Sequence, residues 1–179
     1  AECFSHRSLE LRWKGEQKML PEAVIQCVTT LKQAGYPAYL VGGCVRDILL
    51  GHEPQDFDVA TSAPPAVVQQ LFPRVIPTGL PFGTVTVMLS LPIEVTTFRS
   101  DGRYKDGRHP AEIKFATDIE TDLARRDFTI NAMAWDPLTG TLIDPWGGQA
   151  DLKAGLIRAV GDPAERFSED GLRLLRAVR

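Results

Sequence analysis

The sequence predicts an α+β fold in which helices and short strands build one hydrophobic core. Its 179 residues are 44% hydrophobic, which suffices for one core or for one core with an appendage. Residues 21–35 carry apolar side chains at helical spacing, whereas residues 83–89 alternate threonine and valine as a strand does. Helical and strand patterns therefore alternate along one chain.

The bulk properties exclude several classes of protein. A formal net charge of −3 excludes a globally basic nucleic-acid binder but not a local basic patch. No apolar run approaches the length of a membrane span, and the N-terminus lacks the charged-then-apolar order of a signal peptide. The three scattered cysteines, Cys3, Cys27 and Cys44, indicate reduced thiols rather than a disulfide frame or a zinc site. We therefore expect a cytoplasmic protein with no membrane contact and no metal cluster.

The first part of the chain divides into clear segments. Residues 1–20 are expected to form an N-terminal tail or leader. A helix is expected over residues 21–35, because proline favours its first turn and glycine its end, and Cys27 faces its buried side. The next segments are a strand over 36–41, a short helix over 44–50, a strand from residue 56, and a helix to residue 71 with Ser62 as its N-cap.

The rest of the chain is less regular. Residues 100–110 are rich in glycine and charge and predict a mobile surface loop. Its Arg103, Lys105 and Arg108 form either a solvated run or a loop that closes over a substrate. The other expected segments are strands over 74–76, 83–89 and 93–98, a helix over 118–124, a strand and turn over 142–148, a polar turn and short strand over 152–160, a helical turn over 163–167, and a final helix with Ser168 as its N-cap.

Two aspartates two residues apart point to a metal. On a strand, Asp56 and Asp58 project from the same face while Phe57 enters the core. Neighbouring carboxylates repel each other, and a divalent cation between them relieves this repulsion best. Glu94 is acidic within an apolar strand; such a residue is usually solvated, but on an adjacent strand it would complete a three-carboxylate metal site.

A glycine pair just before the short helix points to a phosphate. Gly42 and Gly43 let backbone amides approach phosphate oxygens closely. Arg46, in the first turn of the helix, either forms an exposed ion pair with Asp47, faces the same anion, or braces the strand of Asp56. A metal beside a phosphate is the hypothesis that these residues support.

Six blocks follow one another in a fixed order: LVGGCVRDILLG (40–51), DFDVATSA (56–63), IEVTTFRSDGRYKDGRHP (93–110), RRDFTINAMA (125–134), LIDPWGG (142–148) and RFSEDGLRLLRAVR (166–179). Together they resemble the class II tRNA nucleotidyltransferase and bacterial poly(A) polymerase family. One such block recurs by chance, whereas six in order are a strong signal. The resemblance implies the head of the nucleotidyltransferase superfamily, with a small mixed, mostly antiparallel sheet flanked by helices and followed by the start of a helical neck.

The resemblance also implies roles at the metal and the phosphates. Asp56, Asp58 and Glu94 resemble the catalytic metal ligands, which would hold two Mg²⁺ ions. Gly42, Gly43 and Arg46 would hold the triphosphate. Arg125, Asp127 and Asn131 resemble the residues that contact the sugar and the phosphates, and a carboxylate bound to a ribose 2′-hydroxyl favours ribonucleotides.

The last block resembles the amino-acid template that reads base edges. Glu169, Asp170 and Arg173 would share one helix face and match the polar groups of C and A. Arg176 is expected farther along that face with Arg179, and the two either continue toward RNA or fold against the helix. His109 stands where many relatives carry a second arginine, so no catalytic role is assigned to it.

The expected domains are the tail (1–20), the catalytic head (21–140) and a head-to-neck segment with the base-recognition helix (141–179). We expect this last segment to be truncated, because the neck of the family continues well beyond it and further domains grip the tRNA.

The leading hypothesis is an enzyme that adds C and/or A from CTP and ATP to the 3′ end of tRNA and releases pyrophosphate. Alternatives within this chemistry are an enzyme that adds only C, one that adds only A, and a poly(A) polymerase. The segment Gly83-Thr84-Val85 favours the tRNA enzymes. A non-catalytic head that binds nucleotide or RNA is the alternative of another class, and the conjunction of Asp56, Asp58, Glu94 and Asp127 weighs against it. The order of the six blocks makes a purely structural domain the weakest alternative.

Overall fold

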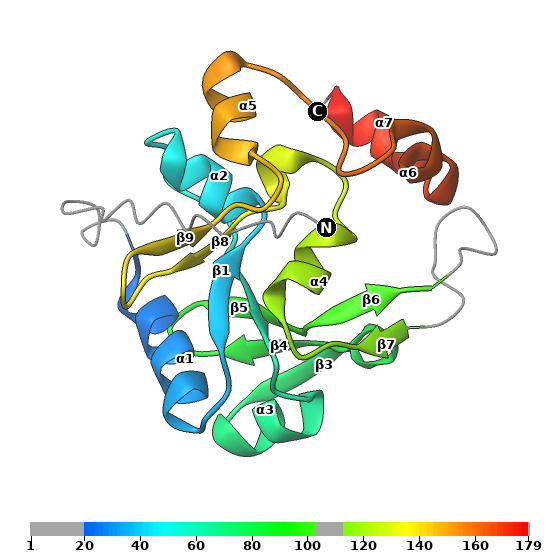
Figure 1. Cartoon of the computed structure of the whole chain (residues 1–179). Coiled ribbons are helices and arrows are strands. Elements are labelled where there is room, and N and C mark those ends of the chain that lie inside the picture. Colours follow the sequence, from blue (N-terminus) through cyan, green and yellow to red (C-terminus); the bar gives the residue numbers. More distant parts are fainter. Residues whose placement is uncertain (1–19, 103–112, 179) are drawn as a thin grey trace, which may run out of the picture.

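A seven-stranded sheet forms the centre of the described part of the molecule (Figure 1). The computed structural model describes residues 20–102 and 113–178. The strand order is β3-β4-β5-β2-β1-β8-β9; β2 and β5 are parallel and every other neighbouring pair is antiparallel. The strands are β1 (Ala38–Val41), β2 (Asp58–Thr61), β3 (Val75–Gly79), β4 (Thr84–Met88), β5 (Pro92–Thr97), β8 (Ala134–Asp136) and β9 (Thr141–Ile143). The mixed, mostly antiparallel sheet flanked by helices is confirmed.

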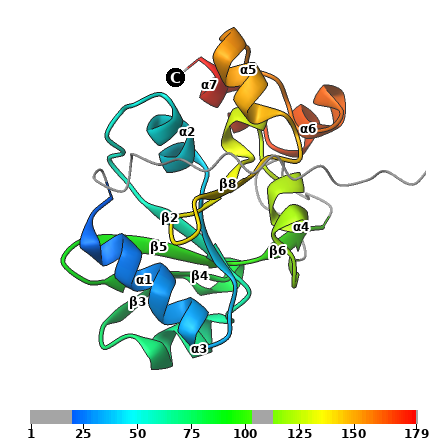
Figure 2. The same ribbon diagram turned by 60° about the vertical axis from the view of Figure 1, so that its left-hand side comes forward.

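The helices and a short hairpin surround this sheet (Figures 1 and 2). Those before β3 are α1 (Glu22–Gln33), α2 (Gly43–Leu49) and α3 (Pro65–Leu71), and the later ones are α4 (Ile119–Ala124), α5 (Gly148–Ala154), α6 (Pro163–Glu169) and α7 (Leu172–Ala177). Two 3₁₀ turns are η2 (Leu80–Phe82) and η3 (Thr129–Asn131), and β6 (Arg99–Asp101) pairs with β7 (Ile113–Phe115) outside the main sheet.

The central strands are buried on both faces. On β1, Leu40 packs in the cluster shared with α1, α2 and α3, whereas Val41 packs in a second cluster with Leu123 of α4. On β2, Val59 and Ala60 divide between the same two clusters. Each such side chain removed from water contributes about 1.5–3 kcal/mol, so the middle of the sheet is the rigid platform of the molecule.

The first helix follows its sequence pattern closely. Val24, Val28 and Leu31 are fully buried at helical spacing, and Gly35 ends the helix with a φ of 89°. Cys27 is buried beside them as expected, and burial raises the pKa of its thiol to about 12. This cysteine is therefore a core residue without thiolate chemistry.

The structure corrects the strand of the two aspartates. Asp56 lies in a bend, and β2 begins only at Asp58, so the two carboxylates are not partners on one strand face. Phe57 between them is buried, as expected. The exposed residues from Gly51 to Glu53 and the buried Pro54 lead into this bend, and pairing with β1 and β5 starts beyond it.

The expected segments after residue 98 need further corrections. Strand β6 (Arg99–Asp101) covers the first residues of the segment that was expected to be a mobile loop, 100–110. Strand β8 was not expected. Helix α5 was not expected; it begins at Gly148 and takes up the first residues of the turn expected over 152–160. Its first N–H groups, of Gly148 and Gln149, donate to the carboxylate of Asp144 at 2.6 and 2.9 Å, which caps the helix. Asp144, four residues before the helix begins, was the sequence signal for this start, and the periodicity of apolar residues does not detect it.

The expected helical turn over 163–167 is part of a longer helix, α6, and the expected start of the final helix at Ser168 is wrong. Asp162 accepts hydrogen bonds from the N–H groups of Ala164 and Glu165, so α6 begins at Pro163 and already contains Ser168. The chain then leaves helical geometry at Asp170 and α7 starts at Leu172. Glu169 and Arg173 consequently lie on different helices.

Some expectations lie outside the described residues. These concern the tail up to residue 19, the loop residues Arg103, Lys105, Arg108 and His109, and Arg179. The domain division at residue 140 stays a prediction, and the β8–β9 hairpin crosses it. Within residues 20–102 and 113–178, no helix is both long and apolar enough to cross a membrane.

Candidate active site

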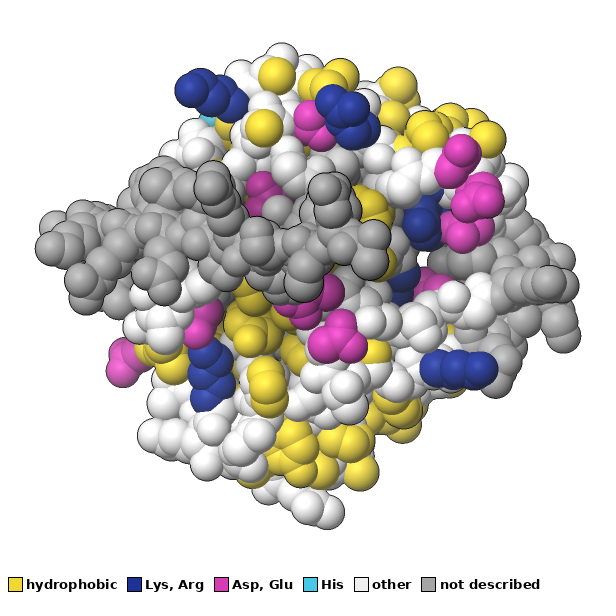
Figure 3. All heavy atoms as spheres, in the orientation of Figure 1, with side chains coloured by type: hydrophobic (Ala, Val, Ile, Leu, Met, Phe, Trp, Pro, Cys, Tyr) yellow, Lys and Arg dark blue, Asp and Glu magenta, His cyan; other side chains and the backbone are white. Residues whose placement is uncertain are grey.

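A cleft of about 1230 Å³ lies between α2, the start of β2, β6 and the final helices. Figure 3 shows basic and acidic side chains around a hollow at the right of the molecule, below the region of α6 and α7. Eleven of the residues expected to bind metal or nucleotide line the cleft: Gly42, Gly43, Arg46, Asp56, Asp58, Arg125, Asp127, Asn131, Asp170, Arg173 and Arg176. Glu94 and Glu169 are not among the lining residues. Segments from four separate blocks of the sequence therefore meet at one cavity.

The acidic side of the cleft is set by the parallel pair of strands. Asp58 on β2 lies opposite Glu94 on β5 in the strand register, and the N–H of Glu94 donates to the carbonyl oxygen of Phe57 at 3.2 Å. Burial, opposed by the charge of Arg126 and aided by that of Asp56, raises the pKa of the Asp58 carboxyl group. Burial and then the charge of Asp58 raise the pKa of Glu94. The three acids thus lie close enough to repel one another.

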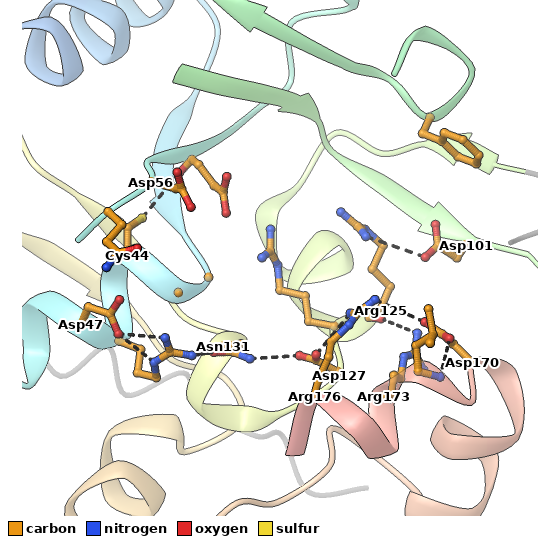
Figure 4. A pocket seen from close by; sticks show the side chains of 18 of the residues that line it. Cys44, Asp47, Asp56, Asp101, Arg125, Asp127, Asn131, Asp170, Arg173 and Arg176 are labelled. Carbon is orange, nitrogen blue, oxygen red and sulfur yellow. Dashed lines mark hydrogen bonds and ion pairs between the residues drawn. The ribbon is translucent and has the colours of Figure 1, made fainter. Parts of the chain in front are cut away.

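The donor set suits Mg²⁺ held by two carboxylates and by substrate phosphates. Hard carboxylate oxygens are the ligands that Mg²⁺ prefers, and it commonly takes only one or two of them from the protein. Asp56 and Asp58 both line the cleft, and Figure 4 labels Asp56. In the described part of the chain, no three acidic, histidine or cysteine side chains surround one common point. The register places Glu94 beside Asp58 without closing the three-carboxylate arrangement that was expected.

The glycine turn requires its first glycine. Gly42 has φ 74° and ψ −138°, a conformation open essentially to glycine alone, and it precedes the first residue of α2. A Cβ atom on Gly42 would lie 2.9 Å from the NH1 atom of Arg126 and 3.7 Å from Oδ2 of Asp58. The guanidinium of Arg126 thus packs against the turn, beside the acids. Arg126 lines the cleft but was not among the expected site residues; its only signal was its place between Arg125 and Asp127.

If this turn holds the triphosphate, as the resemblance implies, Gly42→Ala will weaken CTP binding by about 10-fold, because the new methyl group displaces the Arg126 guanidinium. Gly51→Ala is the matched control, since Gly51 has φ 73° but open space around its Cβ position. Both variants are expected to lose about 1 kcal/mol or more of stability through backbone strain. Isothermal titration with CTP and thermal unfolding separate the two effects, and equal CTP affinities in the two variants would contradict this account.

Arg46 is held from two sides. Its Nε and NH2 atoms donate to Oδ1 of Asp47 at 2.9 and 2.8 Å, and its NH1 donates to Oδ1 of Asn131 at 2.8 Å. The side chain is about one third exposed. Arg46 therefore makes the expected ion pair with Asp47 and at the same time belongs to the cleft wall. It faces η3 rather than bracing the strand of Asp56.

Asp127 is the junction between the side chains of α2 and those of the final helix. Its Oδ1 accepts from the Asn131 side chain at 3.2 Å and from the N–H of Phe128 at 2.8 Å. Its Oδ2 faces NH1 of Arg176 at 3.4 Å, and NH2 of Arg176 lies 3.4 Å from Oδ2 of Asp170. Figure 4 shows this series running from Asp47 on one side of the cleft to Asp170 on the other. Polar contacts thus connect the two ends of the cavity.

The three residues expected to read bases have different positions. Asp170 and Arg173 are almost completely buried and line the cleft. Glu169 does not line it, but its carboxylate accepts hydrogen bonds from Arg173 and from Arg166. Arg173 is further held by the carbonyl oxygens of Arg166 at 2.8 Å and Arg125 at 3.4 Å. In this arrangement Glu169 orients Arg173 rather than facing the cavity.

The far side of the cleft also contains residues that the sequence did not single out. Asp101 and Arg99 on β6 and Phe82 of η2 line it, and the Arg99 guanidinium stacks 5.8 Å from the centre of the Phe82 ring. NH1 of Arg125 lies 3.7 Å from Oδ2 of Asp101. Cys44 also lines the cleft; burial raises the pKa of its thiol to about 11, which keeps it protonated. Arg99 and Asp101 belong to the block at 93–110 and Cys44 to the block at 40–51, but the sequence assigned none of them a role at the site.

Comparison with known proteins places this geometry in a family. Residues 38–158 match the family described as the poly A polymerase head domain. The chain belongs to this family. It is 50% identical over 156 residues to the CCA-adding enzyme of Anoxybacillus flavithermus, covering 87% of this chain and 39% of the relative. It is 49% identical over 172 residues to the CCA-adding enzyme of Levilactobacillus brevis, covering 96% of this chain and 42% of that relative.

Solved structures of two similar proteins have the same fold. The crystal structure of the Bacillus stearothermophilus CCA-adding enzyme in complex with CTP matches with a TM-score of 0.79 and 46% identity, over 87% of this chain and 37% of that one. The Thermotoga maritima CCA-adding enzyme complexed with tRNA_CCA matches with a TM-score of 0.70 and 30% identity, over 90% of this chain and 38% of that one. The chain spans about two fifths of the length of the relatives it matches.

Proposed function

We propose that this chain is the catalytic head of an RNA nucleotidyltransferase that adds C and/or A from CTP and ATP to the 3′ end of tRNA. The observation that carries the proposal is the meeting of Asp56 and Asp58 with the Gly42 turn at one cleft. Acids beside a glycine turn provide for a metal and a polyphosphate together. The similarity to CCA-adding enzymes, including structures with CTP and with tRNA, supports tRNA as the acceptor.

The residues of the cleft divide the work of nucleotidyl transfer. Asp56 and Asp58, with Glu94 beside them, would hold Mg²⁺, which supplies charge that lowers the pKa of the RNA 3′-hydroxyl and stabilises the leaving pyrophosphate. The N–H groups at Gly42 and Gly43, with Arg46 and Arg125, would bind and orient the triphosphate. Asp170 and Arg173 would present an acceptor and a donor to the base edge, with Arg176 between base and ribose.

The same assignment extends to the end of the chain and to its cellular setting. Residues 141–179 would connect the head to a neck, and the grip on tRNA would come largely from parts beyond this chain. Buried free thiols at Cys27 and Cys44 accord with a reducing, cytoplasmic setting.

Asp127 gives a direct test of the ribose assignment. We expect Asp127→Ala to lower the preference for CTP over dCTP by about 10-fold, because the carboxylate that would accept the 2′-hydroxyl proton is lost. Asp144→Ala is the control: Asp144 caps α5 and does not line the cleft. The measurement is kcat/KM for each nucleotide, and an unchanged ratio would remove Asp127 from this role.

The proposed activity is tested by an incorporation assay with the full-length protein. The acceptors are tRNA lacking CCA, tRNA lacking only the terminal A, and an unrelated RNA, each with CTP or ATP and Mg²⁺. Addition of C to tRNA lacking CCA, together with addition of A to tRNA lacking only the terminal A, supports a CCA-adding enzyme. Addition of a single base type identifies a CC- or A-adding enzyme. Long A tracts on the unrelated RNA would replace the proposal with a poly(A) polymerase, and binding of CTP without any addition would indicate a non-catalytic head.

A further inference from the structure

Asp122 lies behind the cleft rather than in it. It belongs to α4, its side chain is fully buried, and it does not line the cavity. Its two carboxylate oxygens are nevertheless divided between two arginines that do line it. Oδ1 accepts from Nε of Arg125 at 3.0 Å, and Oδ2 accepts from NH2 of Arg126 at 3.0 Å.

The helix geometry makes this division possible. Arg125 and Arg126 follow Asp122 by three and four residues, at the point where α4 ends. Side chains at these spacings lie on the same side of a helix, so one carboxylate reaches both guanidinium groups. A guanidinium has five N–H donors in a planar fork, and those not used by Asp122 point elsewhere.

The NH1 ends of the two arginines reach the wall of the cleft on different sides. NH1 of Arg126 packs against the Gly42 turn, 2.9 Å from where a Cβ atom would lie. NH1 of Arg125 lies 3.7 Å from Oδ2 of Asp101 on β6. The Nε atom of Arg126 is buried and makes no hydrogen bond to any described residue. Burying an N–H group without a hydrogen bond costs free energy, and such a group in a folded protein points to a side chain whose position matters.

The charges favour the same interpretation. Burial by itself would raise the pKa of Asp122, but the charges of Arg126 and Arg125 and the hydrogen bonds from both hold that pKa below its usual range. At this wall Arg99, Arg125 and Arg126 pair with two carboxylates, those of Asp101 and Asp122, which leaves one surplus positive charge. Ordering two long side chains before a ligand arrives also lowers the entropy cost of binding it.

We propose that Asp122 is a positioning residue for the nucleotide, because it fixes the guanidinium groups of Arg125 and Arg126 at the cleft wall, where they would bind the polyphosphate. The inference rests on the proposed function for the identity of the ligand. It goes beyond that function by assigning a role to a residue that no substrate can touch. Asp122 acts through the two arginines, and it is not a catalytic residue.

The test compares Asp122→Asn with Asp136→Asn in the full-length protein. Asp136 is the matched control, since it is 5% exposed, is paired with Lys32, and does not line the cleft. The ligands are inorganic tripolyphosphate and CTP, titrated without RNA by calorimetry, and thermal unfolding is measured alongside. We expect both variants to lose stability, but only Asp122→Asn to raise the dissociation constant for both ligands by about 10-fold, as for other residues that orient a binding group.

A double-variant cycle distinguishes positioning from a general loss of structure. In an Arg126→Gln background, adding Asp122→Asn is expected to cause a much smaller further loss of tripolyphosphate affinity than in the wild type, because one of the two arginines through which Asp122 acts is already absent. Asp122→Glu keeps the negative charge and is expected to restore part of the affinity, and it replaces Asp122→Asn in the cycle if that variant does not fold.

Each outcome has one meaning. Equal affinities in Asp122→Asn and Asp136→Asn, or fully additive losses in the cycle, would overturn the positioning role. A wild-type protein that binds both ligands but extends no RNA would overturn the proposed function and still leave the affinity comparison valid. A wild-type protein that binds neither ligand would overturn both.

Discussion

Asp58→Asn is expected to abolish nucleotide addition while making the protein more stable to heat in the absence of divalent cations. The loss of activity follows from the loss of a metal-binding carboxylate at the acidic side of the cleft, and we expect it to reach about 10³-fold or more. The gain in stability follows from the raised pKa of Asp58, which is caused by burial and by the charge of Asp56 against the opposing charge of Arg126.

The sign of the stability effect follows from proton linkage. A carboxyl group whose pKa is higher in the folded than in the unfolded state binds its proton more tightly when folded. Its ionisation above the ordinary aspartate pKa of about 4 therefore destabilises the fold, and the penalty persists at neutral pH. Asparagine carries no such charge, so the wild type should lose stability relative to Asp58→Asn as the pH rises from about 4 toward neutrality.

The measurements are incorporation with Mg²⁺ and thermal unfolding in EDTA over a pH series. Glu22→Gln is the control, because Glu22 is an exposed acid on α1 outside the cleft. We expect this control to change neither quantity noticeably. Wild-type activity in Asp58→Asn would remove Asp58 from the metal site. A lower melting temperature at neutral pH would show that the attraction of the Arg126 charge for Asp58 outweighs the cost of burying the carboxylate.

Arg173→Ala is expected to change the choice between CTP and ATP while the chemical step remains possible. The guanidinium is 4% exposed and lines the cleft, and Glu169 and two backbone carbonyl groups hold it in place. A lost hydrogen bond to a base edge leaves a polar group without a partner, which is worth about 1–3 kcal/mol. We therefore expect the ratio of kcat/KM for CTP and ATP to change by about 10-fold or more.

Arg166→Ala is the matched control for this prediction. Arg166 shares two partners with Arg173, the carboxylate of Glu169 and the carbonyl oxygen of Arg125, but it does not line the cleft. Both variants should unfold at lower temperature, whereas only Arg173→Ala should alter the ratio. If both changed the ratio equally, the effect would come from the packing of α6 and α7 rather than from base contacts by Arg173.

The sequence predicted the regular elements best where burial is one-sided. In α1, apolar side chains recur at helical spacing because one face packs on the sheet, and in β4, Val85 and Val87 alternate with half-exposed residues for the same reason. Helix α5 and the break at Asp170 escaped prediction because the side chains of Asp144 and Asp170 accept hydrogen bonds from the first N–H groups of α5 and α7 and so set where these helices begin. Capping depends on local backbone geometry more than on periodicity.

The chemical types of the site were likewise readable from the chain. Acids at 56, 58 and 94, glycines at 42 and 43 and a cluster of arginine, aspartate and asparagine at 125–131 were singled out from residue types and order alone. The tertiary structure decided which of these residues lie next to one another. The parallel pairing of β2 with β5 brings Asp58 opposite Glu94, and the bend at Asp56 follows from where that pairing begins.

The sequence by itself determined that this chain has a metal-suited acid pair, a phosphate-suited glycine turn and an ordered set of family blocks. Only the tertiary structure decided that Arg126 packs on that turn, that Glu169 turns to Arg173 instead of the cavity, and that Asp122 stands behind both arginines. The physical reason is that residue type limits what a side chain can bind. Partner choice depends on distance, which is set by contacts between segments far apart in the chain.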